Sequence, residues 1–369
     1  MDVADFDFRL PPELIAQEPA LERGAARLLH LDRNGTITHT HVAALPSLLR
    51  RGDVLVVNDT RVFPARLLGR RVPSGGAVEC LLIGRLAGGQ RGSDGGLTPL
   101  WNALMHPGQK LKVGSRVVFE GPGGHDAVLH GEVVGRGSFG RRVIRLWVDA
   151  GPPPLGRDHT SQVDAAIDAI GHVPLPPYIK RDDRPEDRGR YQTIFARQRG
   201  SVAAPTAGLH FDEPLLRSVH DRGVEIVTVT LHVGYGTFQP VRVDCVEDHR
   251  LEPESYEIAG PAAAAINRAL DEGRRVIAVG TTTTRTLEAV AKEHGGRLIA
   301  GAGSTDLFIF PGFAFRVIQG LVTNFHLPRS SLLMLVSAFA GREHVLKAYA
   351  EAIEQRYRFY SYGDAMLIL

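Results

Sequence analysis

The sequence contains few cysteines. There are two in 369 residues, Cys80 and Cys245, and they lie far apart in the chain. Such a pair cannot supply the disulfide framework of a small secreted domain or the closely spaced ligands of a structural zinc site. At this length the chain can bury a large core without such cross-links. We therefore expect a protein of a reducing compartment with no bound metal.

Long hydrophobic runs are also missing. The longest, "LLMLVSAFAG", is too short to cross a bilayer. The first residues, "MDVADFDFRLPPE", have neither the basic nor the apolar region of a signal peptide. These absences predict a cytoplasmic protein with no membrane partner.

The chain has little net charge. Its 43 Lys and Arg balance 41 Asp and Glu, for a formal charge of +2. A charge this small gives little long-range attraction for a polyanion, so any basic surface must be local. The loop "YIKRDDRPEDRGRYQ" is one such candidate. It could be a solvated loop with local ion pairs, or it could contact RNA phosphates while tyrosines stack on bases. The RNA-contact candidates are Arg61, Lys180, Arg181, Arg184, Arg188, Arg190 and Tyr191.

The chain contains two kinds of local sequence pattern, which suggest two domains. Residues 61–150 hold short β-rich pieces separated by glycine clusters, which is typical of a small barrel or sandwich. Elsewhere strand-like and helix-like segments alternate, which favours an α/β fold with a mostly parallel sheet and flanking helices. We predict a discontinuous α/β catalytic domain over 1–60 and 151–369, interrupted by a β-barrel domain over 61–150.

Local signals place several elements. Asn34-Gly35 predicts a hairpin turn within residues 27–42. Asp212 is a plausible N-cap for the helix in "DEPLLRSVHDRG", and the serines of "LPRSSLLMLV" should begin another helix.

Polar clusters follow several strands, where ligands bind in open α/β sheets. In "VIAVGTTTTRTLE" a glycine ends a strand and threonines open a helix. One threonine would suffice for capping. Four threonines followed by Arg285 favour a seat for an anion or carboxylate at the positive helix end. The ligand-binding candidates from the strand-end clusters are Gly234, Gly236, Thr237, Thr281, Thr282, Thr284, Arg285 and Asn324.

Three histidines belong to these clusters: His210 in "GLHF", His232 in "TLHV" and His326 in "NFHL". None has the spacing of a helical metal-binding pair, so a metal is not expected. A hydrogen-bonded structural role is common for a lone histidine, and acid–base chemistry is the alternative. In "LHVGYGTF" the glycines mark either a tight turn or a close approach of backbone to ligand.

Taken in order, these motifs resemble the S-adenosylmethionine:tRNA ribosyltransferase-isomerase family of queuosine biosynthesis. The segments that carry the resemblance are "GDVLVVNDTRVFPARLLG", "HVPLPPYIKR", "RYQTIFARQRGSVAAPTAGLHFDEPLL", "VTLHVGYGTFQPV", "VIAVGTTTTRTLE", "STDLFIFPGFAFRVIQGLVTNFHLPRSSLLMLVSAFAG" and "YRFYSYGDAMLI". They cover nearly the whole chain. The sequence departs from the usual family pattern at Tyr235, Gln239, Glu252 (in "HRLEPE"), Thr283, Thr284 and Gln319.

The resemblance implies an α/β domain with an inserted barrel. It also implies a reaction that moves the ribosyl moiety of S-adenosylmethionine onto 7-aminomethyl-7-deazaguanine at the tRNA wobble position. The product is epoxyqueuosine, and adenine and methionine leave. S-adenosylmethionine is then a cosubstrate, no cofactor is permanently bound, and tRNA is the partner of a protein expected to be a monomer.

Residue chemistry suggests the roles. His232 and His326 are the predicted acid–base pair, with His210 in reserve, because near-neutral pKa values suit proton transfer. Asp306 is the carboxylate expected near the sulfonium. Two other functions stay open at this point. One is an S-adenosylmethionine-dependent RNA methyltransferase, although its glycine-rich loop is not evident. The other is a non-catalytic RNA-binding module.

Overall fold

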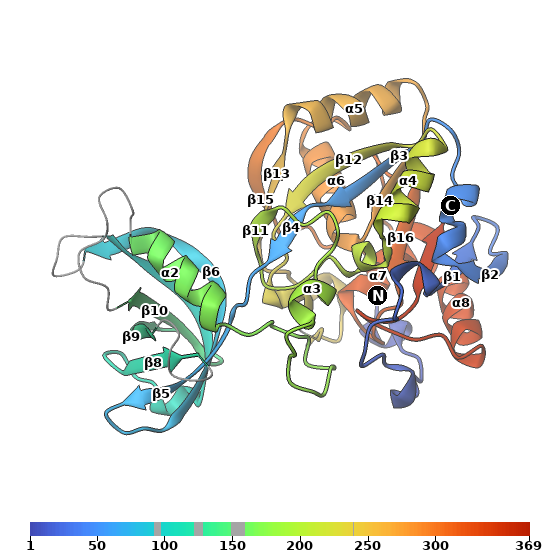
Figure 1. Cartoon of the computed structure of the whole chain (residues 1–369). Helices are drawn as coiled ribbons and strands as arrows, with labels where there is room; N and C mark the ends of the chain where they lie inside the picture. The colour runs from blue at the N-terminus through green and yellow to red at the C-terminus, as the bar shows by residue number, and fades with distance from the viewer. Residues whose placement is uncertain (92–96, 122–127, 149–158, 239) are drawn as a thin grey trace. The chain divides into compact units, whose positions relative to one another are not determined.

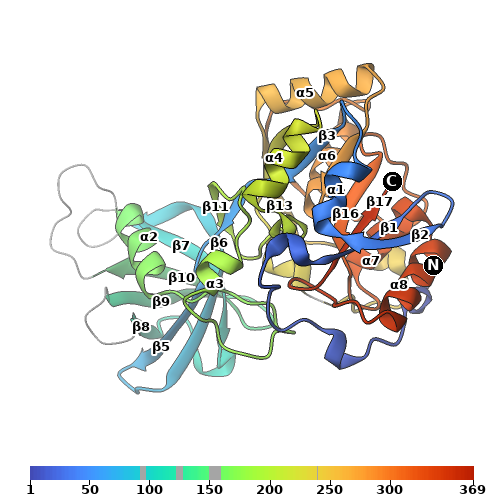
Figure 2. The same cartoon turned by 45° about the vertical axis from the view of Figure 1, so that its right-hand side comes forward.

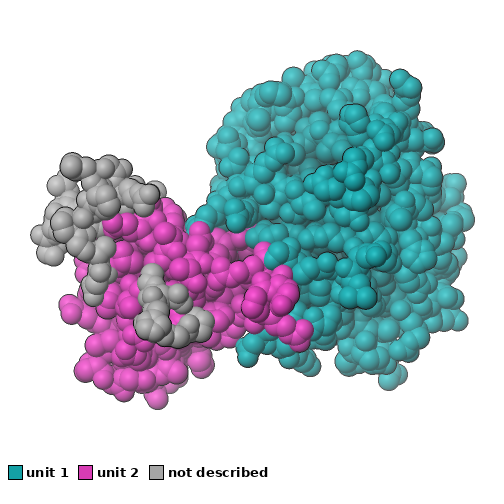
Figure 3. Space-filling model, in the orientation of Figure 1, with its two compact units in different colours: residues 1–61, 176–182, 189–369 teal, residues 62–175, 183–188 magenta. Residues whose placement is uncertain are grey.

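The computed structural model describes residues 1–369 except 92–96, 122–127, 149–158 and 239. The chain divides into two compact units (Figure 3). The larger comprises residues 1–61, 176–182 and 189–369, and the smaller comprises 62–175 and 183–188. The expected domain boundary near residue 150 lies outside the described residues.

A nine-stranded sheet forms the centre of the larger unit (Figures 1 and 2). In spatial order its strands are β15 (Gly301–Thr305), β13 (Glu254–Ile258), β12 (Glu225–Leu231), β3 (Val54–Asn58), β14 (Val276–Val279), β16 (Gly320–Asn324), β17 (Ala365–Ile368), β1 (Arg27–Leu31) and β2 (Ile37–His41). A further pair, β4 (Thr60–Val62) and β11 (Gln198–Ser201), forms a separate two-stranded sheet.

The expectation of a mostly parallel sheet was wrong, because the sheet is mixed. The pairs β12–β3, β3–β14, β14–β16 and β17–β1 are parallel, and the other neighbours are antiparallel. A parallel neighbour needs a crossover, usually a helix, whereas an antiparallel one does not. Among the described residues, no α-helix lies between β12 and β13 or between β1 and β2, and these strands return in the opposite direction.

Helices cover both faces of this sheet. Alternate residues of β3 define the faces: Val54 and Val56 pack in one core and Leu55 and Val57 in the other. The first core takes side chains from α5 (Gly260–Asp271), α6 (Thr281–Glu293), α7 (Ser331–Ala340) and α8 (Arg342–Glu354). The second takes side chains from α1 (Leu45–Leu48) and α4 (Glu213–Asp221) (Figure 2). Burial on both faces explains why β14 and the first four residues of β3 read as continuous apolar runs.

The predicted local signals are confirmed. Gly35 has φ 81° in the turn between β1 and β2, and the Asp32 carboxylate accepts hydrogen bonds from the Asn34 and Thr36 amides. Asp212 caps α4 by accepting a hydrogen bond from the Leu215 amide.

The smaller unit contains the predicted barrel, which is closed and antiparallel. Its strands are β5 (Arg66–Val72), β6 (Ala77–Arg91), β7 (Leu97–His106), β8 (Arg116–Glu120), β9 (Val128–Arg136) and β10 (Arg141–Val148). Helix α2 (His159–Ile170) packs against β7, β9 and β10, and α3 is Asp187–Arg190. Of the described residues, none belongs to a helix long and apolar enough to cross a membrane.

Candidate functional site

A cavity in the larger unit opens where β14 and β16 end and α6 and α7 begin. Five of the predicted site residues line it together: Thr237, Thr281, Thr282, Asn324 and His326. The sequence rule that polar residues at strand ends converge is therefore correct for these two strands. Further lining comes from segments distant in sequence, among them Tyr178, Thr323, Ser330, Tyr360 and Ser361.

Two helix N-termini border this cavity. Gly280 turns the chain from β14 into α6 with φ 91°, a conformation that favours glycine. Helix α6 has no side-chain cap, so its first amides are not satisfied by a capping residue. At α7 the Ser330 hydroxyl accepts from the Leu333 amide and donates to the Leu327 carbonyl, which confirms the predicted serine cap. Both helices direct the positive ends of their dipoles toward this region.

The four consecutive threonines that begin α6 have different roles. Thr283 and Thr284 donate their hydroxyls back to the carbonyls of Val279 and Gly280, at 2.7 and 3.2 Å, and neither lines the cavity. Thr281 and Thr282 do line it. Of the run predicted to bind cosubstrate, the first two residues are therefore placed to contact a ligand.

His326 is a buried, neutral base within the cavity lining. Its Nε2 lies 2.9 Å from the Thr323 hydroxyl, and its backbone amide donates to the Tyr349 hydroxyl at 3.0 Å. Burial lowers the pKa of His326 to about 3, because the desolvated imidazolium is unfavourable. At neutral pH the ring therefore carries no charge, and its pKa lies well below the near-neutral value expected for an acid–base histidine.

Asn324 connects the cavity to His210. Its Nδ2 donates to the Tyr360 carbonyl at 3.0 Å, and a carbonyl can only accept, which fixes the orientation of the amide. The same Nδ2 lies 3.1 Å from His210 Nε2, so that nitrogen must be the acceptor and the ring proton must be on Nδ1. Burial lowers the pKa of His210 to about 4, in agreement with a neutral ring.

Arg285 is held in a buried ion pair that sequence reasoning missed. It pairs with Glu254, and both side chains are 7% exposed. Its guanidinium also donates to the carbonyls of Leu307 and Thr305. The Glu254 carboxylate accepts from the Gly234 amide at 2.7 Å and contacts the Thr237 hydroxyl at 3.4 Å. Arg285 therefore orders the glycine turn through Glu254 instead of contacting a ligand itself.

His232 and Asp306 are not part of the cavity lining. His232 Nδ1 lies 2.7 Å from the Thr60 hydroxyl, and its ring packs over Gly200, where an added Cβ would approach it to 2.6 Å. Burial lowers the pKa of His232, partly opposed by the carboxylate of Asp59. Asp306 is exposed after β15. Gly234 and Gly236 also lie outside the lining, although Thr237 of the same turn belongs to it.

Most arginines of the basic loop bind protein backbone. Arg181 contacts the Gln17 carbonyl and Glu18, and Arg190 contacts the Ala20 and Leu21 carbonyls. In the smaller unit, Arg188 donates to the carbonyls of Asp168 and Gly171.

The remaining members of the RNA-contact set differ in exposure. Lys180 and Arg61 in the larger unit, and Arg184 in the smaller, are exposed. Tyr191 is fully buried and meets Tyr362 edge to face, so its ring cannot stack on a base.

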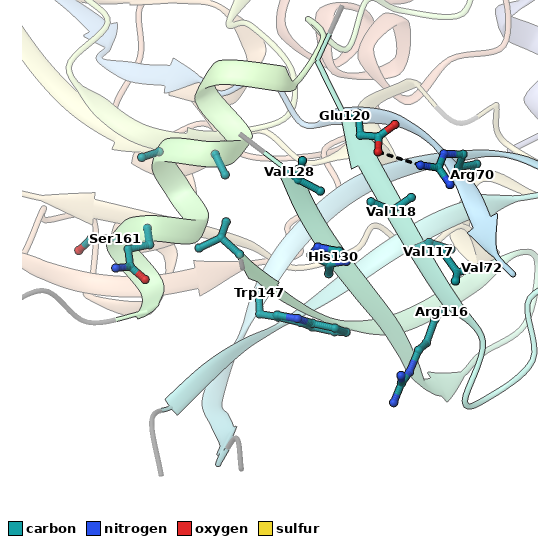
Figure 4. Close-up of a pocket in the computed structure, with 14 residues that line it drawn as sticks. Arg70, Val72, Arg116, Val117, Val118, Glu120, Val128, His130, Trp147 and Ser161 are labelled. Carbon is teal, nitrogen blue, oxygen red and sulfur yellow. Dashed lines mark hydrogen bonds and ion pairs between the residues drawn. The ribbon is translucent and has the colours of Figure 1, made fainter. Parts of the chain in front are cut away.

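A second cavity, of about 1250 Å³, lies in the smaller unit between α2 and the barrel strands (Figure 4). Valines and alanines form much of its lining, with an Arg70–Glu120 ion pair at 2.8 Å and Trp147 stacked on His130. None of the predicted site residues lines it.

Two further departures from the family pattern are Gln319 and Gln239. Gln319 is far from the site, because it pairs with Val276 at the opposite end of β14: its side-chain oxygen accepts from the Val276 amide at 2.8 Å. Gln239 lies outside the described residues. Among the residues that are described, no three His, Cys, Asp or Glu side chains form a group that could hold a metal ion.

Comparison with known proteins gives one consistent result. A family model described as "Queuosine biosynthesis protein" matches residues 3–368. S-adenosylmethionine:tRNA ribosyltransferase-isomerases of Desulfitobacterium hafniense and Heliobacterium modesticaldum are 48% and 49% identical over the whole of both chains. A crystal structure of an S-adenosylmethionine tRNA ribosyltransferase from Thermotoga maritima is 36% identical. The match covers 99% of this chain and 100% of that one, with a TM-score of 0.53.

Proposed function

Since the chain belongs to the S-adenosylmethionine:tRNA ribosyltransferase-isomerase family of queuosine biosynthesis, we propose that the cavity beyond β14 and β16 is its active site. The enzyme transfers and isomerises the ribosyl moiety of S-adenosylmethionine onto 7-aminomethyl-7-deazaguanine in tRNA, giving epoxyqueuosine. The observation that carries the assignment of the site is the meeting of two helix N-termini with the buried side chains of His326 and Asn324.

The start of α6 suits the methionine carboxylate of the cosubstrate. An anion is stabilised at the N-terminus of a helix by the free amides and the helix dipole. Thr281 and Thr282 add hydroxyls to the same surface, and Thr237 adds another from the turn that Glu254 holds. Two helix ends would bind the carboxylate without a charged side chain, since Arg285 is already paired.

We assign two proton transfers to His326: its imidazole is a weak base at a pKa of about 3, and its imidazolium is a correspondingly strong acid. The sulfonium acidifies the C5′ hydrogens of the ribose, and a neutral imidazole can accept one of these protons. With a pKa of about 3 the resulting imidazolium is a strong acid, which favours passing the proton to the departing adenine. One proton thus leaves C5′ and one reaches adenine. The attacking amine loses its own N–H proton to solvent as its bond to the ribosyl carbon forms, and methionine departs as a neutral thioether with the electrons of the broken C–S bond. His210, neutral and bonded to Asn324, then orients the amide.

Exposed basic residues of the larger unit are the best candidates for tRNA phosphates. Lys180 and Arg61 are exposed, whereas Arg181 and Arg190 hold backbone carbonyls. A tRNA substrate fits a cytoplasmic location. A monomer is sufficient, because one chain supplies every residue of the proposed site.

Product analysis tests the proposed reaction. The protein is incubated with S-adenosylmethionine and a tRNA that carries 7-aminomethyl-7-deazaguanine at the wobble position. Free adenine and epoxyqueuosine in the digested tRNA are the expected products. S-adenosylhomocysteine with a methylated nucleoside would instead indicate a methyltransferase, and binding of tRNA without adenine release would indicate a non-catalytic module.

A further inference from the structure

Tyr360 has a strained backbone beside the proposed active site. Its φ is 73°, in the left-handed region that a bulky residue rarely adopts and that strains the backbone. Several bonds maintain this conformation. The Tyr360 backbone amide donates to the Phe325 carbonyl. The Tyr360 carbonyl accepts from the backbone amide of Gly363 and from the side-chain Nδ2 of Asn324. Strain that is held in place next to a cavity is typical of a residue whose side chain must occupy one position.

The Tyr360 side chain forms part of an aromatic surface in this cavity. Its ring is stacked on that of Tyr178, with the ring centroids 4.4 Å apart and an interplanar angle of 20°. Both residues line the cavity. The Tyr178 hydroxyl lies 2.5 Å from the Ser361 hydroxyl, which fixes the second ring. A rigid pair of stacked rings offers the flat apolar contact that a heteroaromatic base requires.

Two residues that line this cavity each carry a polar side-chain atom without a hydrogen-bond partner among the described residues. Among the described residues, the Tyr360 hydroxyl and Asn324 Oδ1 are both buried without a hydrogen bond. The side chain of Asn324 is 2% exposed, and its orientation is fixed by the Tyr360 carbonyl, so the unpaired atom is an acceptor. A buried polar atom left unpaired destabilises the folded protein, and a ligand with matching groups would remove this destabilisation.

From this geometry we infer that Asn324 Oδ1 and the Tyr360 hydroxyl recognise the edge of a purine-type base that presents an N–H donor beside an acceptor. Asn324 accepts from the exocyclic amine of the base, and Tyr360 donates to the neighbouring ring nitrogen. The inference rests on the proposed function, whose substrates supply two such bases. One is the adenine of S-adenosylmethionine, and the other is the 7-aminomethyl-7-deazaguanine of the tRNA.

The Tyr360→Phe variant tests this role, because it removes only the unpaired hydroxyl. The folded protein loses no hydrogen bond, so the urea midpoint should stay at the wild-type value. The KM of the substrate whose base is recognised should rise about 3- to 10-fold, the effect of one hydrogen bond. A rise in the KM of S-adenosylmethionine assigns the subsite to adenine. A rise in the KM of the tRNA assigns it to the deazaguanine.

Tyr357→Phe is the matched control. Tyr357 is also buried, but its hydroxyl pairs with His39 at 2.8 Å outside the cavity lining. This variant should lower the urea midpoint and leave both KM values unchanged. Wild-type KM values for both substrates in Tyr360→Phe, with adenine still released by the wild-type enzyme, would overturn the inference. No adenine release by the wild-type enzyme would instead overturn the proposed function.

Binding of free bases supplies a second readout. Wild-type protein should bind the recognised base more tightly than the analogue without the exocyclic amino group. The pairs are adenine against purine, and 7-aminomethyl-7-deazaguanine against its 2-deamino analogue. The preference should be about tenfold if Asn324 Oδ1 accepts from that amine. Equal affinity within both pairs would contradict the role of Asn324.

Discussion

Removing one partner of the buried ion pair between Arg285 and Glu254 should strongly lower the free energy of unfolding of the larger unit. Both side chains are 7% exposed, so Glu254→Gln leaves the Arg285 cation buried without a counter-charge. Loss of one partner of a buried ion pair costs about 3–5 kcal/mol. This is a large share of the free energy of unfolding of a protein, which is roughly 5–15 kcal/mol. The glutamine keeps a side-chain oxygen for the Gly234 amide, so the loss of charge is the main change.

Urea denaturation monitored by two spectroscopic signals can distinguish the unfolding of the two units. Both tryptophans, Trp101 and Trp147, lie in the smaller unit, so their fluorescence reports on the barrel. Far-ultraviolet circular dichroism reports on both units. Glu254→Gln should shift the main dichroism transition to lower urea and leave the fluorescence transition in place. Adding Arg285→Met should recover about 1–3 kcal/mol, because the two positions are in direct contact. A loss below about 1 kcal/mol in Glu254→Gln would refute this account of the pair.

Two further predictions concern pH and salt. Burial lowers the pKa of His326 to about 3 in the folded protein, below its usual 6.5, so the unfolded chain takes up the proton first. Stability should therefore fall as pH drops from about 6.5 toward 3. His326→Gln should flatten that slope in urea midpoints, whereas His220→Gln, at a side chain 80% exposed, should not. Lys180→Ala should weaken tRNA binding and lower the salt dependence of log K by about one unit, as expected for one phosphate contact. An unchanged salt dependence of log K in Lys180→Ala would show that Lys180 does not contact a tRNA phosphate.

Local chemistry made several elements of the fold predictable. The Asn34-Gly35 turn, the Asp212 cap and the Ser330 cap each depend on residues within a few positions of one another. The direction of a strand, in contrast, depends on which strand it pairs with, and that partner can be distant in the sequence. The apolar runs of β16 and β17 are compatible with either parallel or antiparallel pairing, and the structure makes them antiparallel. The mixed character of the sheet therefore could not be obtained from periodicity alone.

The candidate site was predictable to the same extent. The rule for strand ends located Thr281, Asn324 and His326, because each directly follows β14 or lies at the end of β16. It could not show that Arg285 pairs with Glu254, 31 residues earlier. Nor could it show that Tyr360 reaches the cavity from the segment before β17. Such contacts depend on tertiary packing. In the sequence, Glu254 and Tyr360 are marked only by their places in the family motifs "HRLEPE" and "YRFYSYGDAMLI".

The central claim is that His326, within the cavity beyond β14 and β16, transfers the protons of the reaction. The most direct test is the rate of adenine release from S-adenosylmethionine with 7-aminomethyl-7-deazaguanine tRNA, compared between His326→Gln and His232→Gln. The account predicts that His326→Gln lowers kcat by about 10²–10⁴, the usual contribution of an acid–base group, while its circular dichroism spectrum stays native. His232→Gln should keep most of the activity. A folded His326→Gln enzyme with wild-type kcat, or a larger loss in His232→Gln, would contradict the claim.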